Sequence, residues 1–305
     1  MDRFESISAF VAVARAGGFS AAARQLGVPL ATISRRVAEL ETDLGARLLQ
    51  RSTRQVGLTE QGKAFLGSCE RVLDDLRDAQ EAVTGEYRSP KGELALTAPV
   101  GFGRIHLQPI ALDFLAAYPE IRLRLLLVDR VVQLAEEHVD LALRIAQLPD
   151  SSLIARPVGH IRIVVCASPQ YLARHGTPGH PRELIQHDGI SWTTLGLPES
   201  WSFRVGAVPQ RFAVRTRLVT TTADSALAAA QAGLGLLQTT SYQAEAALRD
   251  GRLVRVLREF EDAPTPVSLV YAGNRLLPLK LRAFVDFAVP RLTARLQAVD
   301  TAYVE

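Results

Sequence analysis

The stretch from residue 19 to residue 44, FSAAARQLGVPLATISRRVAELETDL, constrains the fold more than any other part of the chain. Its first half is rich in alanine, the strongest helix former, with Ser20 as the expected N-cap and Gly27 as the residue that ends the helix. Pro29 stands where a second helix can begin. This second helix carries one apolar stripe, formed by Ile33, Val37, Leu40 and Leu44. The pattern predicts two short helices joined by a tight turn.

Polar and basic side chains crowd the first turns of the second helix, and most of them lie off its apolar stripe. They are Thr32, Ser34, Arg35 and Arg36. A helix-turn-helix presents its second helix to the major groove of DNA in this way. A helical hairpin with a solvated basic face is the alternative, and the stretch alone does not decide between the two.

The charge of the chain favours the DNA-binding alternative. Residues 1–63 hold nine Lys or Arg and six Asp or Glu, a net charge of +3, which equals the net charge of all 305 residues. The acids Glu39, Glu41 and Asp43 lie at the far end of the second helix, so its N-terminal end is the basic end and also carries the positive helix dipole. This polarity suits a phosphate partner.

Two predicted elements after the helix-turn-helix extend this DNA-binding head. Residues 47–51 and 55–59 are expected to form a hairpin, a wing whose Arg51 and Arg54 can contact phosphates or the minor groove; a plain surface turn is the alternative. Thr59 is the expected N-cap of a helix that runs to about residue 87. Apolar residues recur along this helix at heptad spacing: Phe65, Cys69, Val72, Leu76, Ala79 and Val83. The spacing favours a dimerisation helix over a helix that lies on its own domain.

Beyond a polar linker at residues 89–92 the pattern changes to alternating strands and helices. The expected strands are 94–98, 122–128, 140–145, 161–167, 212–217, 234–238 and 266–271, and the expected helices are 104–117, 131–137, 169–175, 223–232, 241–249 and 279–292. Alternation of this kind indicates an α/β domain with a largely parallel sheet.

Composition excludes several classes of protein. No apolar run is long enough to span a bilayer, and the N-terminus lacks the apolar segment of a secretory signal, so we expect a cytoplasmic protein without a membrane partner. Cys69 and Cys166 are too few and too distant for a disulfide framework, and the histidines lack zinc-ligand spacing, so we expect no metal and no cofactor. Cys166 is interpreted as a buried strand cysteine rather than a redox sensor.

The residues that predict the DNA-binding head also fall in the order and spacing of a known family. They are Phe10, Ser20-Ala21-Ala22, Leu26-Gly27-Val28, Ile33-Ser34-Arg35, Leu40-Glu41, Leu44-Gly45, Leu48, Arg51, Leu58-Thr59 and Gly62. In these residues the chain resembles the LysR-type transcriptional regulators. Segments 98–104, 139–144, 166–172 and 232–235 look like the CrgA-like subgroup of that family.

The resemblance implies a multidomain fold: a winged helix-turn-helix of the all-α type, a long linker helix, and an α/β two-lobed domain of periplasmic-binding-protein type 2. The expected boundaries are residues 1–59, 60–89 and 90–305, with lobe I at about 90–162 and 266–305 and lobe II at about 163–265. The resemblance also implies a homodimer or homotetramer on promoter or operator DNA, with a small-molecule effector bound between the lobes. RNA polymerase is a candidate further partner.

Eight residues are predicted to contact DNA: Ser20, Leu30, Thr32, Ser34, Arg35, Arg36, Arg51 and Arg54. Arginine is the commonest specific reader of guanine, whereas Ser20 and the wing arginines are expected to hold phosphates. Many family members carry Ser-Gln-Pro or Ser-Gln-Ser where this chain has Pro29-Leu30-Ala31. A Gln there reads adenine, but Leu30 makes only apolar contact, for instance with a thymine methyl.

Nine residues are predicted to bind the effector, because such a cleft lies at strand C-termini and helix N-termini. They are Pro99, Val100, Gly101, Asp129, Arg144, Trp192, Thr220, Thr221 and Asp224. Trp192 is a candidate stacking wall. Arg144 suits an anion, and pairing with Asp129 or Asp140 is the alternative. For Thr221 and Asp224 the alternative is helix capping.

Two other functions were weighed against DNA-binding regulation. A solute-binding protein is disfavoured by the missing signal segment and by ninety residues of basic helical N-terminus. An enzyme is disfavoured because the sequence holds no nucleophile-elbow, P-loop or dinucleotide-binding motif. The sequence therefore predicts a sequence-specific transcriptional regulator that is modulated by a small molecule and is not an enzyme.

Overall fold

The chain divides by its internal contacts into two compact units, Met1–Glu93 and Leu94–Glu305. The computed structural model describes residues 2–51, 56–84, 89–149, 151–192, 200–206, 208–273 and 277–304. The boundaries expected near residues 59 and 89, and those between the lobes, stay predictions.

The first unit is a small helical bundle with a two-stranded hairpin. Its elements are α1 (Arg3–Ala16), α2 (Phe19–Leu26), α3 (Leu30–Leu44), β1 (Leu49–Arg51), β2 (Val56–Leu58) and α4 (Glu60–Thr84). Gly27 and Gly45 end α2 and α3 in the left-handed conformation, at φ values of 66° and 62°. The predicted N-cap of α2 was wrong: α2 begins at Phe19 with Gly18 as N-cap, and Ser20 is an exposed residue of its first turn.

The core of this unit is built by the stripe that the sequence predicted on α3. Ile33, Val37 and Leu40 are buried, and they pack with Phe10 of α1 and Ala22 of α2. Burying each large aliphatic or aromatic side chain stabilises the fold by about 1.5–3 kcal/mol. Because the apolar face of α3 is buried in this core, the polar residues of its first turns lie on the faces of the helix that point away from the core.

Helix α4 uses its N-terminal half to complete the same core. The rings of Phe65 and Phe10 lie 5.8 Å apart, Cys69 is buried, and Arg15 Nε lies 2.7 Å from Glu70 Oε1. Phe65 and Cys69 of the predicted dimer seam thus pack against α1, and the dimerisation role of this helix stays a prediction. Val72 and Leu76 are 44% and 36% exposed, and the side chains of Ala79 and Val83 lie outside the described part of the chain.

The second unit holds two five-stranded sheets. One has the order β4-β3-β5-β14-β6 and the other β11-β8-β12-β7-β13, and β9 pairs with β10 as a separate hairpin. The strands are β3 (Gly92–Ala98), β4 (Ile121–Leu127), β5 (Leu141–Ile145), β6 (Leu153–Ile161), β7 (Ile163–Ala167), β8 (Asp188–Trp192), β9 (Ser200–Val205), β10 (Val208–Ala213), β11 (Arg215–Thr220), β12 (Leu236–Thr240), β13 (Val254–Val256) and β14 (Thr265–Ala272).

Both sheets are mixed, so the expectation of a largely parallel sheet was wrong. Strand β3 runs parallel to β5, and β8 parallel to both β11 and β12. Strand β14 runs antiparallel to β5 and β6, and β7 antiparallel to β12 and β13. The physical reason is that the chain passes from one sheet to the other along β6 and β7 and returns along β13 and β14, and each return strand runs against its neighbours.

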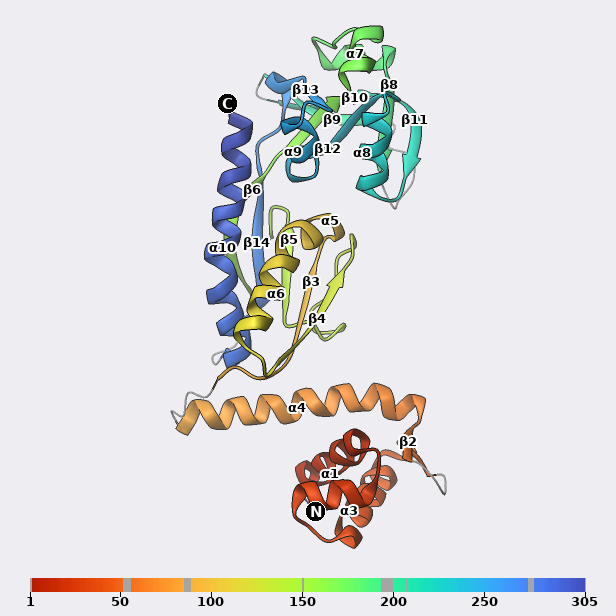
Figure 1. The fold of residues 1–305 in the computed structure, drawn as a ribbon, viewed down its shortest axis with the longest axis vertical. Helices are drawn as coiled ribbons and strands as arrows, with labels where there is room; N and C mark the ends of the chain where they lie inside the picture. Colours follow the sequence, from red (N-terminus) through yellow and green to blue (C-terminus); the bar gives the residue numbers. More distant parts are fainter. Residues whose placement is uncertain are drawn as a thin grey trace. The chain divides into compact units, whose positions relative to one another are not determined.

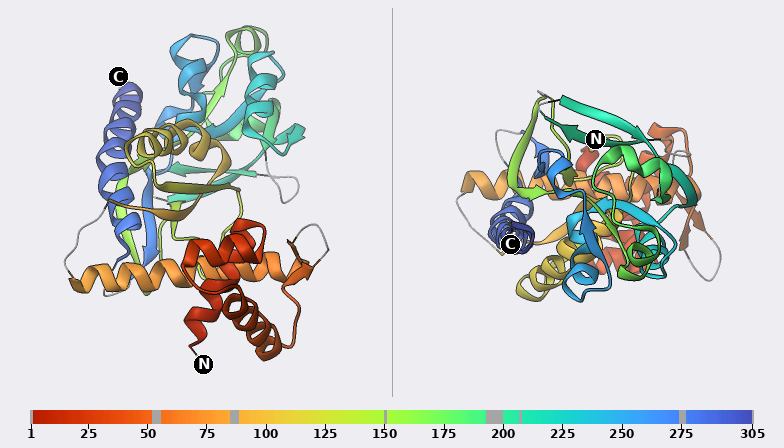
Figure 2. Two further views of the ribbon diagram at one scale, coloured as in Figure 1. Left: turned by 60° about the horizontal axis from the view of Figure 1, so that its bottom comes forward. Right: turned by 90° about the horizontal axis from the view of Figure 1, so that it is seen from above.

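Helices cover both sheets. They are α5 (Val100–Phe102), which continues through a π-helical turn at Gly103–Leu107 into α6 (Gln108–Ala117), then α7 (Pro169–His175), α8 (Ala223–Gln231), α9 (Ser241–Arg249) and α10 (Leu279–Val304), with 3-10 turns at Pro181–Gln186 and Arg258–Phe260. Figures 1 and 2 show α10 lying alongside β6.

Several predicted elements differ from the structure. The helix expected at 104–117 begins earlier, at Val100, and the last helix continues beyond residue 292 to Val304. The expected helix at 131–137 is absent: residues 134–138 form a turn, which His138 ends with a left-handed φ of 52°. The strand expected at 212–217 is divided between β10 and β11. Strands β6, β8, β9, β10 and β13 were largely missed.

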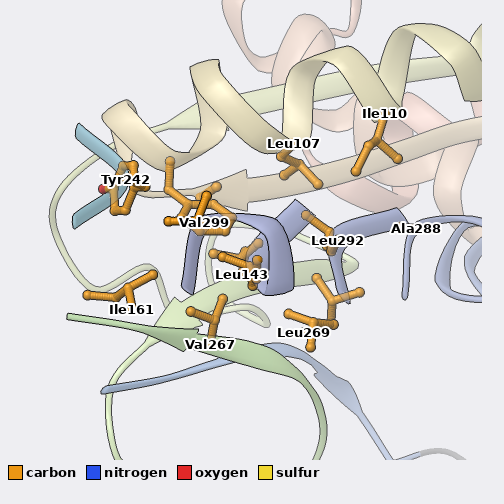
Figure 3. Packing of buried hydrophobic residues seen from close by; sticks show 14 of the residues in the cluster. Leu107, Ile110, Leu143, Ile161, Tyr242, Val267, Leu269, Ala288, Leu292 and Val299 are labelled. Atoms are coloured by element: carbon orange, nitrogen blue, oxygen red, sulfur yellow. The ribbon is translucent and has the colours of Figure 1, made fainter. Parts of the chain in front are cut away.

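The larger of two hydrophobic clusters described in the second unit joins its two sheets. Figure 3 shows Leu107 and Ile110, from the helix that runs from Val100 to Ala117, packed over the strand residue Leu143. Leu292 of α10 joins the same cluster, as does Leu237 of β12 in the other sheet. The two sheets are therefore tied together by apolar burial as well as by the chain crossings.

Two glycines of α4 provide a matched test of how closely this helix approaches the wing. A Cβ on Gly62 would lie 2.0 Å from the Leu48 carbonyl oxygen, whereas a Cβ on Gly67 would meet nothing within 4 Å. We expect Gly62→Ala to lower the free energy of unfolding of the first unit by about 1–3 kcal/mol or more through overpacking. We expect Gly67→Ala to raise it by up to about 1 kcal/mol, because alanine favours helix.

Peptide-resolved hydrogen exchange over residues 2–84 measures both variants. Faster exchange in Gly62→Ala alone is the expected result. Equal protection in the two variants would contradict the close contact between α4 and Leu48.

Candidate functional site

The amino end of helix α3 presents an exposed surface in the first unit. Pro29 is the N-cap and makes no side-chain capping bond, and Leu30 is 48% exposed. Thr32 and Ser34 are half-buried. The Arg35 side chain is 72% exposed, and its Nε lies 3.8 Å from Glu39 Oε1, which is a weak surface contact. Arg35 is therefore free to reach a ligand in front of the helix.

The structure places Arg36 differently from its neighbour. Its guanidinium donates to Glu5 Oε2 on α1, and the Arg36 side chain is only 21% exposed. An ion pair at a surface contributes about 0–1 kcal/mol. Arg36 thus joins α3 to α1, and the role predicted for it as a DNA reader competes with this contact.

The wing is fixed to α3 and α4 by two side chains. Glu41 Oε1 accepts hydrogen bonds from the backbone N–H of Leu48 at 2.8 Å and of Leu49 at 3.0 Å. Thr59 Oγ1 donates to the Arg47 carbonyl at 2.8 Å and accepts from Gly62 N at 2.9 Å, which confirms Thr59 as the N-cap of α4. The position of Arg51 in β1 is set by its register with Val56. Its side chain, and all of Arg54, lie outside the described residues.

Two adjoining cavities of about 380 and 560 Å³ lie in the second unit. They share Val128, Asp129, Arg130 and Trp192. One is walled by the carboxyl ends of β3, β4 and β5, and the other adds the amino end of α8. Together they form one cleft with walls from both sheets.

Eight of the nine predicted effector residues line this cleft. Pro99 and Arg144 face the smaller cavity, four residues face the larger, and Asp129 and Trp192 face both; the four are Val100, Gly101, Thr221 and Asp224. Thr220 lines neither cavity: it ends β11, opposite Trp192 in the strand register.

Other lining residues were missed by sequence reasoning. They are Thr97, Ala98, Leu127, Val128, Arg130, Val131, Leu143, Ile145, Ala146, Thr222, Ala223 and Gln243. Most flank a predicted residue by one or two positions at a strand end, so a wider window around each strand end would have found them. Gln243 carries no such local signal, because it comes from α9.

Three acidic groups near the cleft already have partners. Asp129 Oδ1 accepts from the backbone N–H of Val100 at 3.0 Å, at the amino end of α5. Arg130 forms a two-point pair with Glu137, Nη1–Oε1 at 2.5 Å and Nη2–Oε2 at 2.6 Å. This hydrogen-bonded pair raises the pKa of Arg130 and lowers the pKa of Glu137.

The third acid, Asp224, makes a contact between the two lobes. Arg104 Nη2 donates to Asp224 Oδ1 at 2.7 Å and to Oδ2 at 2.9 Å. The cap of α8 is Thr222, which accepts from Ser225 N at 3.4 Å. The capping alternative for Thr221 and Asp224 was therefore wrong.

Arg144 differs from the other charged residues of the cleft. It donates to the Val132 carbonyl, and no carboxylate pairs with it among the described residues. The predicted alternative partners are engaged elsewhere, Asp129 at Val100 and Asp140 Oδ2 at the Ala95 N–H, 2.7 Å away. Burial lowers the pKa of the Arg144 guanidinium.

Comparison with known proteins decides the family. Residues 4–63 match the bacterial regulatory helix-turn-helix protein, lysR family, and residues 88–293 match the LysR substrate binding domain. The chain belongs to the LysR family of transcriptional regulators. Its regulatory unit is an effector-binding domain, and the family's function is DNA-binding transcription regulation rather than catalysis, as the sequence predicted.

Similar proteins cover nearly the whole chain. An HTH-type transcriptional regulator of Xanthomonas campestris is 40% identical over 292 residues, covering 93% of this chain and 83% of the relative. CrgA of Neisseria meningitidis is 32% identical over 289 residues, and its solved structure, matched over 94% of this chain and 98% of CrgA, has a TM-score of 0.61. The full-length structure of AphB of Vibrio cholerae has a TM-score of 0.60 at 30% identity, with 94% and 98% covered. The CrgA-like resemblance is thereby confirmed.

Other chemistries find little support in the described part of this regulator. Cys69 and Cys166 are buried, and burial raises the pKa of their thiols to about 11 and about 12, so neither is a reactive thiolate at neutral pH. Within the described ranges, no three His, Cys, Asp or Glu side chains are grouped to hold a metal ion. None of the described helices is long and apolar enough to cross a membrane.

His106 lies buried in the regulatory unit, between rings from both lobes. Its ring centroid is 4.7 Å from that of Phe102 and 5.6 Å from that of Tyr242 on α9. Its Nε2 has no hydrogen-bond partner in the described part of the protein. Burial, together with the positive charge of Arg295, lowers the pKa of His106 from 6.5 to about 4. The folded regulator therefore keeps this ring neutral.

Lowering the pH is expected to destabilise the regulatory unit through His106. The unfolded chain binds the proton at about pH 6.5 and the folded chain only near pH 4, so the free energy of unfolding falls as the pH drops through this window. The loss reaches roughly 3 kcal/mol, at about 1.4 kcal/mol for each pH unit. Guanidinium unfolding followed by the fluorescence of Trp192 and Trp201, both in this unit, measures it.

The variant His106→Leu removes the titrating ring and should flatten the pH dependence over this window. His160→Leu, an exposed position on β6, is the control and should leave it unchanged. A His106→Leu profile as steep as that of the wild type would contradict the assignment.

Proposed function

We propose that this regulator reads its operator with the exposed amino end of α3, using Leu30, Thr32, Ser34 and Arg35. The observation that carries the proposal is the exposed Arg35 guanidinium, whose carboxylate neighbour among the described residues, Glu39, is 3.8 Å away. Arginine binds guanine through two parallel hydrogen bonds in the major groove. Arg36 serves chiefly to fix α3 against Glu5 and adds positive charge behind the reading surface.

Phosphate contacts complete the proposed interface. Ser20 is exposed in the first turn of α2, where its hydroxyl and the helix amino end both favour a phosphate oxygen. Arg51 and Arg54 are assigned to phosphates on the sequence alone. Because the proposed target is operator DNA, the proposed site of action of the protein is the cytoplasm.

A second copy of the chain is the proposed partner of the distal half of α4. Val72 and Leu76 belong to the heptad pattern and remain exposed on the first unit, whereas Phe65 and Cys69 are covered by α1. Apolar residues at this spacing pair with an identical helix. A homodimer, or a homotetramer built from two dimers, would present two reading heads to a symmetric operator. Contact with RNA polymerase is a candidate next step at the promoter.

The cleft of the regulatory unit is the proposed effector site, with Pro99, Val100, Gly101, Asp129, Arg144, Trp192, Thr221 and Asp224 in contact with the ligand. Its support is the convergence of these residues on one pair of adjoining cavities. Thr220 is assigned to the support of Trp192 rather than to the ligand.

Arg35→Ala is expected to weaken operator binding by about 5- to 150-fold at fixed salt, the loss of one bidentate base contact. Arg282→Ala is the matched control, because Arg282 also lies exposed on a helix with an acid at i+4, 3.8 Å away, but in the regulatory unit. Mobility shift with the operator measures affinity, and size-exclusion chromatography checks that oligomers persist. Unchanged affinity in Arg35→Ala would remove Arg35 from the interface.

Leu30→Gln is expected to change base preference rather than overall affinity. The amide of Gln hydrogen-bonds adenine through two atoms, whereas Leu30 contacts a thymine methyl. Selection of bound sequences from a random DNA pool at constant salt should show adenine enriched at one step of each half-site. Leu26→Gln, a position 39% exposed at the end of α2, is the control. The same selected sequence for Leu30→Gln and the wild type would exclude Leu30 as a base reader.

A further inference from the structure

We propose that the effector is an organic anion with a single negative charge, held by Arg144 and packed against Trp192 through an apolar body. The inference rests on the proposed use of the cleft as the effector site. It adds the chemical class of the ligand and the residue that anchors its charge.

Most charges around the cleft are cancelled within the protein. Arg130 is neutralised by the two-point pair with Glu137, and Asp224 by the two hydrogen bonds from Arg104. Arg144 is the cation that remains, because its described partner is a backbone carbonyl rather than a carboxylate. Among its described lining residues, the cleft therefore has one cation without a carboxylate partner, beside one carboxylate, Asp129, whose partner is a backbone N–H.

The carboxylate of Asp129 occupies the second group that could bind an anion, which is the amino end of the helix that starts at Val100. The amino end of the helix that starts at Val100 points its N–H groups at this part of the cleft, and helix amino ends favour negative charge. Here the Asp129 carboxylate already accepts from Val100 N at 3.0 Å. A ligand carboxylate at this helix end would displace Asp129 or meet its like charge. A second negative charge on the ligand is thus selected against.

The setting of Arg144 suits a carboxylate. Its guanidinium sits half-buried at the end of β5, next to buried Leu143, and lines the smaller cavity. Desolvation without a compensating anion is unfavourable for the charged guanidinium, and a bound carboxylate would relieve it. The planar donor fork of arginine matches the two oxygens of a carboxylate.

The remaining walls call for an apolar, flat ligand body. Trp192 lines both cavities, and Val131, Leu143 and Ile145 line the smaller one beside Arg144. An aromatic ring stacked on an indole gains about 0.5–1.5 kcal/mol beyond its buried area. The anchor comes from lobe I and the stacking wall from lobe II, so one ligand touches both lobes.

The test uses the full-length protein and three simple probes: benzoate, its neutral analogue benzamide, and the dianion phthalate. Isothermal titration calorimetry should show benzoate binding to the wild type about tenfold or more tighter than benzamide and phthalate, because one charged hydrogen-bonded contact distinguishes them. Arg144→Gln should lose this preference, with benzoate weakened by about tenfold or more, and Arg144→Lys should restore part of it.

Two further variants test the charge argument itself. The double variant Arg130→Gln and Glu137→Gln removes a cancelled pair from the same cleft, and we expect benzoate affinity within about threefold of the wild type. Asp129→Asn removes the carboxylate at the helix end, and we expect the affinity for phthalate to rise about tenfold more than the affinity for benzoate. Thermal melts of each variant establish that it is folded.

The outcomes separate this inference from the proposed function. Failure of benzoate to bind the wild type at millimolar concentration, equal binding of benzoate by Arg144→Gln, or tighter binding of the zwitterion 4-(aminomethyl)benzoate would overturn the single-anion class. If Arg144→Gln binds normally but Trp192→Ala binds weakly, the cleft stays the effector site and only the anchor is wrong. If both variants bind normally, the cleft itself is excluded, whereas DNA reading is judged separately by Arg35→Ala.

Discussion

One continuous hydrophobic core through both sheets of the regulatory unit decides where its cleft can lie. Leu143 of one sheet and Leu237 of the other are fully buried members of the same cluster. Close-packed apolar side chains fill the part of the interior that this cluster occupies. The cavities therefore open where strand ends and helix starts from the two lobes face each other, and the backbone polar groups at those ends supply the hydrogen bonding. The apolar residues that both cavities share are Trp192, at the end of β8, and Val128, which follows β4.

In the DNA-binding head, too, a buried core determines which residues face outward. Burial of Ile33, Val37 and Leu40 fixes the rotation of α3 about its axis, and this rotation alone turns Arg35 outward. Glu41 then ties the far end of α3 to the start of the wing through two backbone N–H groups. The orientation of the reading surface proposed at the amino end of the helix thus depends on a core at its middle and on two hydrogen bonds at its other end.

Local patterns predicted the features that depend on neighbouring residues. The Thr59 cap and the left-handed glycine ends of α2 and α3 depend on a few adjacent positions, and they were found. Ser20 was misassigned because the actual N-cap, Gly18, offers no side-chain signal. The cleft was located by its strand ends, but the partner of Asp129 lies 29 positions away in the sequence and that of Asp224 lies 120 positions away. Pairings at such separations follow from topology, and no local pattern encodes them.

The ion pair between Arg104 and Asp224 is one contact between the lobes, in addition to the hydrophobic core that they share. Both side chains are more than half exposed, and pairs of this kind contribute about 0–1 kcal/mol. A contact of this size biases an equilibrium between lobe arrangements by at most about fivefold. A ligand shifts such an equilibrium only by the difference in its affinity for the two arrangements. An anion that contacts Arg144 in one lobe and Trp192 in the other loses one of these contacts when the lobes separate. The free energy of effector binding in the cleft therefore exceeds the contribution of the Arg104–Asp224 pair. The effector rather than the ion pair would decide which lobe arrangement the regulator adopts.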